Sequence, residues 1–181
     1  MSFVESFGHG MIEAFLEDGD LHFLRDRDGD FVVEFGYDDE IAGHPRFLLA
    51  AVGDDHEQYC MRGDIMCRVP RPDWDRMLRL CNEWNTLYKM PKVYLEVDDP
   101  NASTTGRVVC EQWLNLEAGI HQELVNQLTS TFFSACFGFW RWMRRQNAMH
   151  ALGDLNQDSP EELPSDEGKE ENEREGESER S

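Results

Sequence analysis

Two short runs of alternating apolar residues, separated by an Asp-Gly pair, set the strongest local constraint on the fold of this chain. LHFLRD and DFVVEFGY flank Arg27, Asp28 and Gly29. Asp-Gly between such runs is a strong short-range signal for a two-stranded hairpin. Two further runs follow, PRFLLAAVG and EQYCMRGDIMCRV, and Gly63 in the second is expected to form a bulge or bend. The first half of the chain therefore predicts four consecutive strands.

Helical segments precede and follow these strands. Gly10 to Asp18 is predicted to form a short amphipathic helix that stops at Gly19. A second helix is predicted from Pro72, because proline is tolerated in a first turn, and it stops before Pro91. A long helix is predicted from about Gly119 to Met149.

Between the second and the last helix, MPKVYLEV and GRVVCEQWLNL alternate as strands around the turn-rich segment DDPNASTTG. The predicted order is therefore α-β-β-β-β-α-β-β-α. This order indicates an α+β fold in which helices pack on an antiparallel sheet.

The C-terminal part of the chain has a different composition from the rest. Beyond Leu163 it contains no apolar residue larger than proline, so it cannot bury enough surface to offset the entropy of ordering. Residues 154–181 contain 12 acidic and 3 basic residues, a net charge of −9, which leaves −11 for the preceding body. We predict one α+β domain over residues 1–153 and a disordered acidic tail over residues 154–181.

The charge and the hydropathy of the chain exclude some function classes. With 37 acidic and 17 basic residues, the surface repels phosphate backbones, so no direct nucleic-acid binding is expected. No run approaches the roughly 20 apolar residues of a membrane span, and the N-terminus is too acidic and interrupted for a signal peptide. A cytoplasmic location without membrane contact is expected, and the five widely spaced cysteines are predicted to be reduced core residues.

No motif for catalysis, metal binding or cofactor binding is found. The segment DRDGD has its glycine at position four, whereas an EF-hand loop needs it at position six. The six histidines form neither HxxxH nor HExxH, and CxxC and GxSxG are absent. We therefore predict no catalytic residue, no metal site, no cofactor and no enzymatic activity.

The second helix carries two asparagines near its apolar face. Asn85 falls inside the apolar arc and Asn82 at its edge; the arc consists of Trp74, Met77, Leu78, Cys81, Trp84 and Tyr88. Amides on a buried face need partners, so we predict that both act as a polar clamp that bonds the backbone of a neighbouring strand or loop. The alternative is that they contact a small ligand in a pocket between sheet and helix.

The apolar arc of the last helix exceeds roughly 200°, which is wider than the stripe that a surface helix buries. One side of this helix consists of Ile120, Leu124, Leu128, Phe132, Ala135, Phe139 and Met143. Beyond it lie Phe133, Phe137 and Trp140, and large aromatic residues are enriched in interface cores. We predict that these three form a homodimer interface. The alternative is that the first helix of the same chain covers them.

A family resemblance extends this interpretation. LCNEWNTLYKMPKVYLEVDD and GRVVCEQWLNLEAGIHQELVNQLTSTFFSACFGFWRWM resemble the YbjN family of bacterial proteins, which are described as sensory transduction regulators. The residues that carry the resemblance are Cys81, Asn82, Trp84, Asn85, the strands Pro91 to Leu95 and Gly106 to Leu116, and Phe139-Trp140. The resemblance implies a fold similar to type III secretion chaperones, a dimer and no catalytic residues. The acidic tail and the DDPNAST loop depart from the family pattern.

The function predicted from the residues and the resemblance is that of a non-catalytic, protein-binding domain. It would act as a chaperone-like or signalling adaptor in a bacterial cell, as a homodimer with a regulator or client as its protein partner. The tail would tune solubility or partner choice. The alternative is a sensor domain that holds a small ligand, with Asn82 and Asn85 as its polar contacts.

Overall fold

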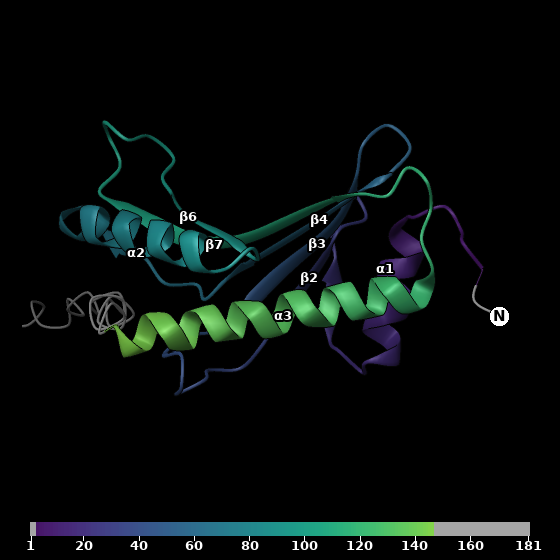
Figure 1. Ribbon diagram of the computed structural model, residues 1–181, viewed down its shortest axis with the longest axis horizontal. Coiled ribbons are helices and arrows are strands. Elements are labelled where there is room, and N and C mark those ends of the chain that lie inside the picture. The colour runs from purple at the N-terminus through teal and green to yellow at the C-terminus, as the bar shows by residue number, and fades with distance from the viewer. Residues whose placement is uncertain (1–2, 147–181) are drawn as a thin grey trace, which may run out of the picture.

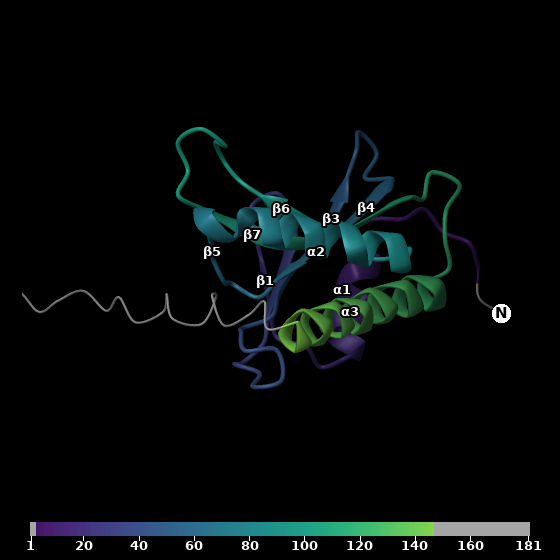
Figure 2. The same cartoon turned by 60° about the vertical axis from the view of Figure 1, so that its left-hand side comes forward.

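The computed structural model of the chain describes residues 3–146 and shows a seven-stranded antiparallel sheet with three α-helices (Figures 1 and 2). The elements are α1 (His9–Asp18), β1 (Phe23–Arg25), β2 (Phe31–Glu34), β3 (Arg46–Val52), β4 (Gln58–Asp64), β5 (Val69–Pro70), the 3-10 turn η1 (Arg71–Asp73), α2 (Trp74–Leu87), β6 (Lys92–Glu96), β7 (Thr105–Asn115) and α3 (Gln122–Arg145). The predicted α+β class and antiparallel sheet are confirmed.

The strands β1 to β4 pair in sequence order, and β7 then pairs with β4. Glu111 of β7 lies opposite Arg62 of β4 and also opposite Lys92 of β6, so β4 and β6 flank β7 on its two sides. The two-residue strand β5 pairs with the start of β7. The longest strand, β7, therefore joins the strands β1 to β4 to the strand β6.

The Asp-Gly hairpin forms as predicted between β1 and β2. The side chain of Asp26 accepts hydrogen bonds from the backbone N–H groups of Asp28 and Asp30, at 2.9 Å each. Gly29 adopts a φ of 92°, which an L-residue with a Cβ rarely tolerates. The turn thus uses Gly29 of the Asp-Gly signal, whereas the side chain that accepts hydrogen bonds is that of Asp26.

All three helices pack on one face of the sheet. The α3 side chains Phe132, Cys136 and Phe139 are fully buried over it. Aromatic contacts link this helix to β3, since Phe47 stacks on Phe133 with ring centroids 4.0 Å apart. Helix α2 lies beside α3, with the Trp84 and Phe139 rings 5.1 Å apart. Burial of each such large side chain stabilises the fold by about 1.5–3 kcal/mol.

Gly63 does not form the predicted bulge. The β3–β4 register runs through it without interruption, with Gly63 opposite Phe47. A Cβ at this position would lie 3.0 Å from the Phe47 ring and 3.5 Å from the Cys136 sulfur. The glycine is therefore explained by close packing of α3 on the sheet rather than by a change of register.

Three further predictions from periodicity are corrected. The run predicted as one strand from Glu57 to Val69 is split, because β4 ends at Asp64 and the separate strand β5 follows. Leu78 of α2 and Leu124 of α3 are 51% and 42% exposed, although both were assigned to apolar faces. A helical projection orders residues around an axis but does not show where the neighbouring layer ends.

Some predictions fall partly outside the described residues. Helix α3 is described to Arg145, so the predicted extension to Met149 and the tail over residues 154–181 lie outside them. Within residues 3–146, no helix combines the length and the apolar character needed to cross a membrane.

Candidate functional site on the helix-free face of the sheet

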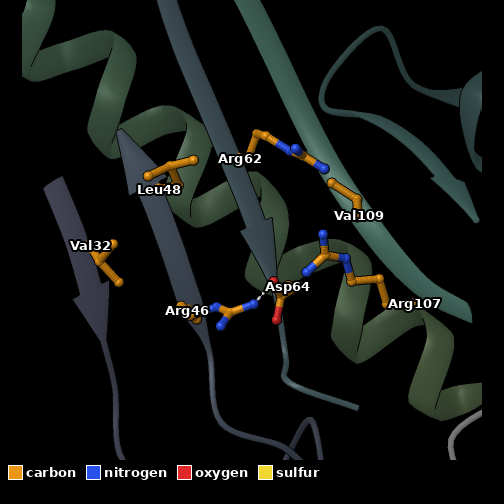
Figure 3. A pocket seen from close by; sticks show the side chains of 7 residues that line it. All are labelled: Val32, Arg46, Leu48, Arg62, Asp64, Arg107 and Val109. Carbon is orange, nitrogen blue, oxygen red and sulfur yellow. Dashed lines mark hydrogen bonds and ion pairs between the residues drawn. The ribbon is translucent and has the colours of Figure 1, made fainter. Parts of the chain in front are cut away.

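The face of the sheet opposite the helices presents polar and aliphatic side chains together (Figure 3). We call it the helix-free face. Because side chains alternate along a strand, those that flank the buried ones point to this side. They form a shallow hollow lined by Val32, Arg46, Leu48, Arg62, Asp64, Arg107 and Val109. Residues of the four strands β2, β3, β4 and β7 therefore form the hollow.

Cross-strand register places an arginine opposite a carboxylate three times on this face. Arg46 lies opposite Asp64, and its Nη2 donates to Asp64 Oδ2 at 2.8 Å. Arg62 lies opposite Glu111, with its Nε 3.7 Å from Glu111 Oε1. Arg107 lies opposite Glu96 and donates to it through Nε. Opposite charges in such cross-strand positions stabilise a sheet by roughly 0.2–1 kcal/mol per pair.

Glu96 links two of these pairs. Its second oxygen accepts a hydrogen bond from Arg62 Nη2 at 2.6 Å. Partial burial raises the pKa of Glu96, but the hydrogen bonds from Arg107 and Arg62 outweigh this effect and hold the pKa below the ordinary value. The carboxylate therefore stays ionised well below neutral pH and keeps both guanidinium groups in place.

Tyr94 extends the network to the edge of the sheet. Its hydroxyl donates to Glu111 Oε1 at 2.9 Å. Burial and this hydrogen bond raise the pKa of Tyr94 to about 12, so the phenol remains a donor at physiological pH. Four strands, β3, β4, β6 and β7, are thus tied together by polar groups on the helix-free face.

The hollow between these side chains has a volume of about 180 Å³. Its aliphatic part comes from Val32, Leu48 and Val109, and its rim comes from Arg46, Arg62 and Arg107. Trp113 adds an indole to the same face and is 48% exposed. An open hollow with an aliphatic lining, guanidinium donors and an exposed aromatic ring nearby has the composition of a protein-recognition surface.

This composition does not include an activated nucleophile. Cys60 lies on the helix-free face opposite Trp113, but burial, followed by the charge of Glu111, raises the pKa of its thiol to about 11. A thiol with that pKa is protonated and unreactive at neutral pH. Residues 3–146 bring together no group of three or more His, Cys, Asp or Glu residues that could hold a metal ion.

Asn85 and Asn82 are both exposed on α2, but their side chains differ in hydrogen bonding. The amide nitrogen of Asn85 donates to Val93 O at 2.8 Å, and the Val93 N–H donates to Asn85 Oδ1 at 3.0 Å. This pair of bonds joins the helix to β6, and it occupies the amide that the ligand-sensor alternative would need. Asn82 is exposed, and its side chain takes part in none of the hydrogen bonds described within residues 3–146.

The three aromatic residues predicted for a dimer interface lie against the chain's own core. Trp140 is 1% exposed and contacts Phe47 and Phe137. Phe133, which is half-buried, contacts Phe15 of α1 edge to face, with ring centroids 6.0 Å apart. The first helix and β3 thus cover part of the wide apolar arc, and Trp140 is buried within one chain.

The cysteines lie as expected for reduced thiols. All five are free, and four are buried, with Cys67 intermediate. Burial raises the pKa of Cys81 to about 12 and also raises the pKa of Cys110, whose thiol lies beside that of Cys136. These groups connect α2, β7 and α3 as small core residues.

The helix-free face was not predicted from the sequence. A local signal existed, because Arg46 and Leu48 alternate with buried residues, as do Arg62 and Asp64. Alternation shows that one face of each strand is polar. It does not show that β4 pairs with β7, about 50 residues away, and only this pairing brings Arg62 to Glu111.

Comparison with known proteins agrees with this architecture. No protein in the curated set matches the chain. The crystal structure of YbjN, described as "a putative transcription regulator from E. coli", superposes with a TM-score of 0.62 at 9% sequence identity. The match covers 80% of this chain and 96% of that one, and at this identity it shows a shared fold.

The sequence pattern of the YbjN family, described as "Putative bacterial sensory transduction regulator", matches residues 9–145. These bounds run from the start of α1 to the end of α3, so they include every described helix and strand. The chain belongs to the YbjN family.

Proposed function

We propose that this protein is a non-catalytic regulatory adaptor that binds a protein partner on its helix-free face. The observation that carries the proposal is the hollow rimmed by Arg46, Arg62 and Arg107 on a sheet face that the three helices leave uncovered. The family description as a regulator supports the general class. The raised thiol pKa values support a role without catalysis.

The chemistry of the face favours one kind of partner segment. Each guanidinium carries five N–H donors, and the described bonds of Arg46 and Arg107 use one donor each. Donors that remain can pair with carboxylates of a partner, and charge-assisted pairs of this kind are the stronger hydrogen bonds. The aliphatic lining of Val32, Leu48 and Val109 suits an aliphatic side chain. The proposed partner therefore presents an aliphatic residue next to acidic residues.

Site-specific photo-crosslinking in cells tests this proposal. A photoreactive amino acid replaces Trp113 on the helix-free face in one variant, and Leu87 on α2 in a matched control; these positions are 48% and 62% exposed. The Trp113 position should yield a discrete crosslinked protein, and mass spectrometry should place the crosslink in an acidic segment with aliphatic residues. The Leu87 position should yield none.

A second pair of variants measures how much the rim contributes. Once the partner is identified, Arg46→Ala should weaken its binding by roughly 10-fold, as loss of a charge-assisted contact worth about 1.5 kcal/mol predicts. Arg27→Ala, on the hairpin turn, should leave the affinity unchanged. Crosslinks that arise only from Leu87, or equal affinity for all variants, would contradict the proposal.

The homodimer predicted from α3 remains a separate proposal. Since Trp140 lies in the core, Phe133 and Phe137 are the members of that set with surface left for a second copy. Light scattering across a range of micromolar concentrations measures the oligomeric state. A monomer at every concentration would exclude the dimer without affecting the proposal for the helix-free face.

A further inference from the structure

Basic residues are concentrated at one end of the molecule, where α2 begins and α3 ends. Seven of the 14 Lys and Arg residues in positions 3–146 belong to this end: Arg68, Arg71, Arg76, Arg79, Arg141, Arg144 and Arg145. The two helix ends are in contact, because Arg76 Nη2 donates to the backbone oxygen of Gln146 at 2.8 Å. We call this set the arginine end.

Few acidic groups offset these charges locally. Asp73 and Asp75 lie in the same stretch as four of the arginines, Glu83 follows Arg79 by one helical turn, and Glu40 pairs with Arg141 at 2.6 Å. The other arginines of α3 and α2 are exposed or half-exposed to solvent. The arginine end is therefore positive on a body whose net charge is −11.

The chain leaves the described structure at this same end. Gln146 is its last described residue and lies within hydrogen-bonding distance of Arg76. Residues 154–181, with 12 acidic and 3 basic residues, begin only eight positions later. The seven intervening residues span at most roughly 25 Å, at about 3.3–3.6 Å per residue. The most acidic segment of the chain is thus tethered next to its most basic surface.

Tethering favours this segment over an acidic segment from another molecule. A short linker holds an attached group at an effective concentration on the order of millimolar. A separate acidic molecule has no such linker, so only its bulk concentration acts on the arginine end. Charge complementarity and connectivity therefore point to the same occupant.

We propose that the arginine end is a docking surface for the acidic residues 154–181 of the same chain. Exposed ion pairs contribute roughly 0–1 kcal/mol each, so the contact depends on several pairs at once. Salt weakens it, because the Debye length falls from about 10 Å at 0.1 M to about 3 Å at 1 M. The docked segment is then held weakly at the arginine end and is released by salt.

Paramagnetic NMR on the full-length chain tests the proposal. A spin label is attached to a cysteine introduced by Ser181→Cys, and the same label reaction on the wild type measures labelling of the native thiols, four of which are buried. At low salt, amide signals in Arg68 to Arg79 and Arg141 to Gln146 should be broadened. At about 1 M salt these signals should recover.

Two double variants of the labelled chain test whether the broadening comes from docking on the arginines or only from the attachment of the tail to α3. Arg79→Glu with Arg145→Glu, both exposed, should abolish the broadening in Arg68 to Arg79. Arg27→Glu with Lys89→Glu, also exposed, changes the net charge equally and should preserve it. An unchanged dispersion of amide signals verifies that each variant is folded.

Three outcomes would overturn the proposal. The first is broadening confined to the last residues of α3, and the second is broadening spread evenly over the body. The third is broadening of Arg68 to Arg79 that both double variants affect equally. None of these outcomes bears on the crosslinking result at Trp113, so the two proposals fail independently.

Discussion

The two faces of the sheet are built from the same strands but from different chemistry. On the helix-covered face, Phe47 and Tyr59 are fully buried against aromatic residues. On the helix-free face, the neighbouring positions Arg46 and Arg62 pair with carboxylates and remain about one-third exposed. One face therefore carries most of the stability of the fold, whereas the other can change its contacts at small cost to stability.

The largest contrast between the faces should come from replacing a tryptophan on each. Trp140→Glu places a carboxylate in the core and should lower the free energy of unfolding by about 3–5 kcal/mol or more. Trp113→Glu, on the helix-free face, should lower it by less than about 1 kcal/mol. Urea denaturation measures both. A stable Trp140→Glu protein that changes only its oligomeric state would instead restore the predicted dimer interface.

A smaller effect is expected from a single added methyl group under α3. Gly63→Ala puts a Cβ 3.0 Å from the Phe47 ring and should destabilise the fold by about 1–3 kcal/mol. The matched control is Gly138→Ala within α3, where a Cβ meets nothing within 4 Å and should stabilise the helix by about 0.5–1 kcal/mol. Equal thermal midpoints for the two variants would show that a Cβ at position 63 does not destabilise the fold, and would contradict the role given to close packing there.

The α2–β6 contact allows a test with two asparagines three residues apart. Asn85→Ala leaves the N–H and the C=O of Val93 without their present partner and should cost about 1–3 kcal/mol. Asn82→Ala should change the stability by no more than about 0.5 kcal/mol, because its exposed side chain takes part in none of the hydrogen bonds described within residues 3–146. Denaturant unfolding measures both, and similar losses would contradict the assignment of the clamp to Asn85 alone.

The smallest effect concerns pH and belongs to the helix-free face. The pKa of Glu96 is lower in the folded protein than its ordinary value, so its contribution is present above the unfolded pKa, near 4.5. This contribution is lost as the pH falls through the folded pKa. Since Asp30 has a raised pKa and acts in the opposite sense, the informative quantity is the difference between wild type and Glu96→Gln.

Thermal unfolding of both proteins between about pH 6 and pH 3 measures this difference. It should be largest at the upper end of the range and should shrink as the pH falls below about 4.5. A difference that stays constant across the range would show that the ion pairs of Glu96 contribute nothing to stability.

Local signals made most of the fold predictable. The Asp28-Gly29 pair gave the β1–β2 hairpin, and proline and glycine marked the ends of α1 and α2. These features depend on residues close together in sequence. The split between β4 and β5 was missed, because periodicity does not show where a strand loses its partner.

The candidate site was less predictable, for a related reason. Asn85 was identified because its amide lies on the apolar arc of α2, and the same argument wrongly included Asn82 among residues facing a neighbouring strand. Trp140 was assigned to the surface because the arc of α3 is wide, whereas α1 and β3 share in covering it. Each error concerns which layer lies over a residue, and this depends on pairing between distant parts of the chain.

The position of β7 between β4 and β6 has a consequence for biosynthesis. Six strands, β1 to β6, and the helices α1 and α2 are synthesised before residues 110–115, which supply the partner for β4. Until then, β4 has an unpaired edge, and such edges are where nascent chains aggregate. Productive folding of this protein must therefore wait for a strand made late in translation, and a chain released before Asn115 lacks the pairing that closes its sheet.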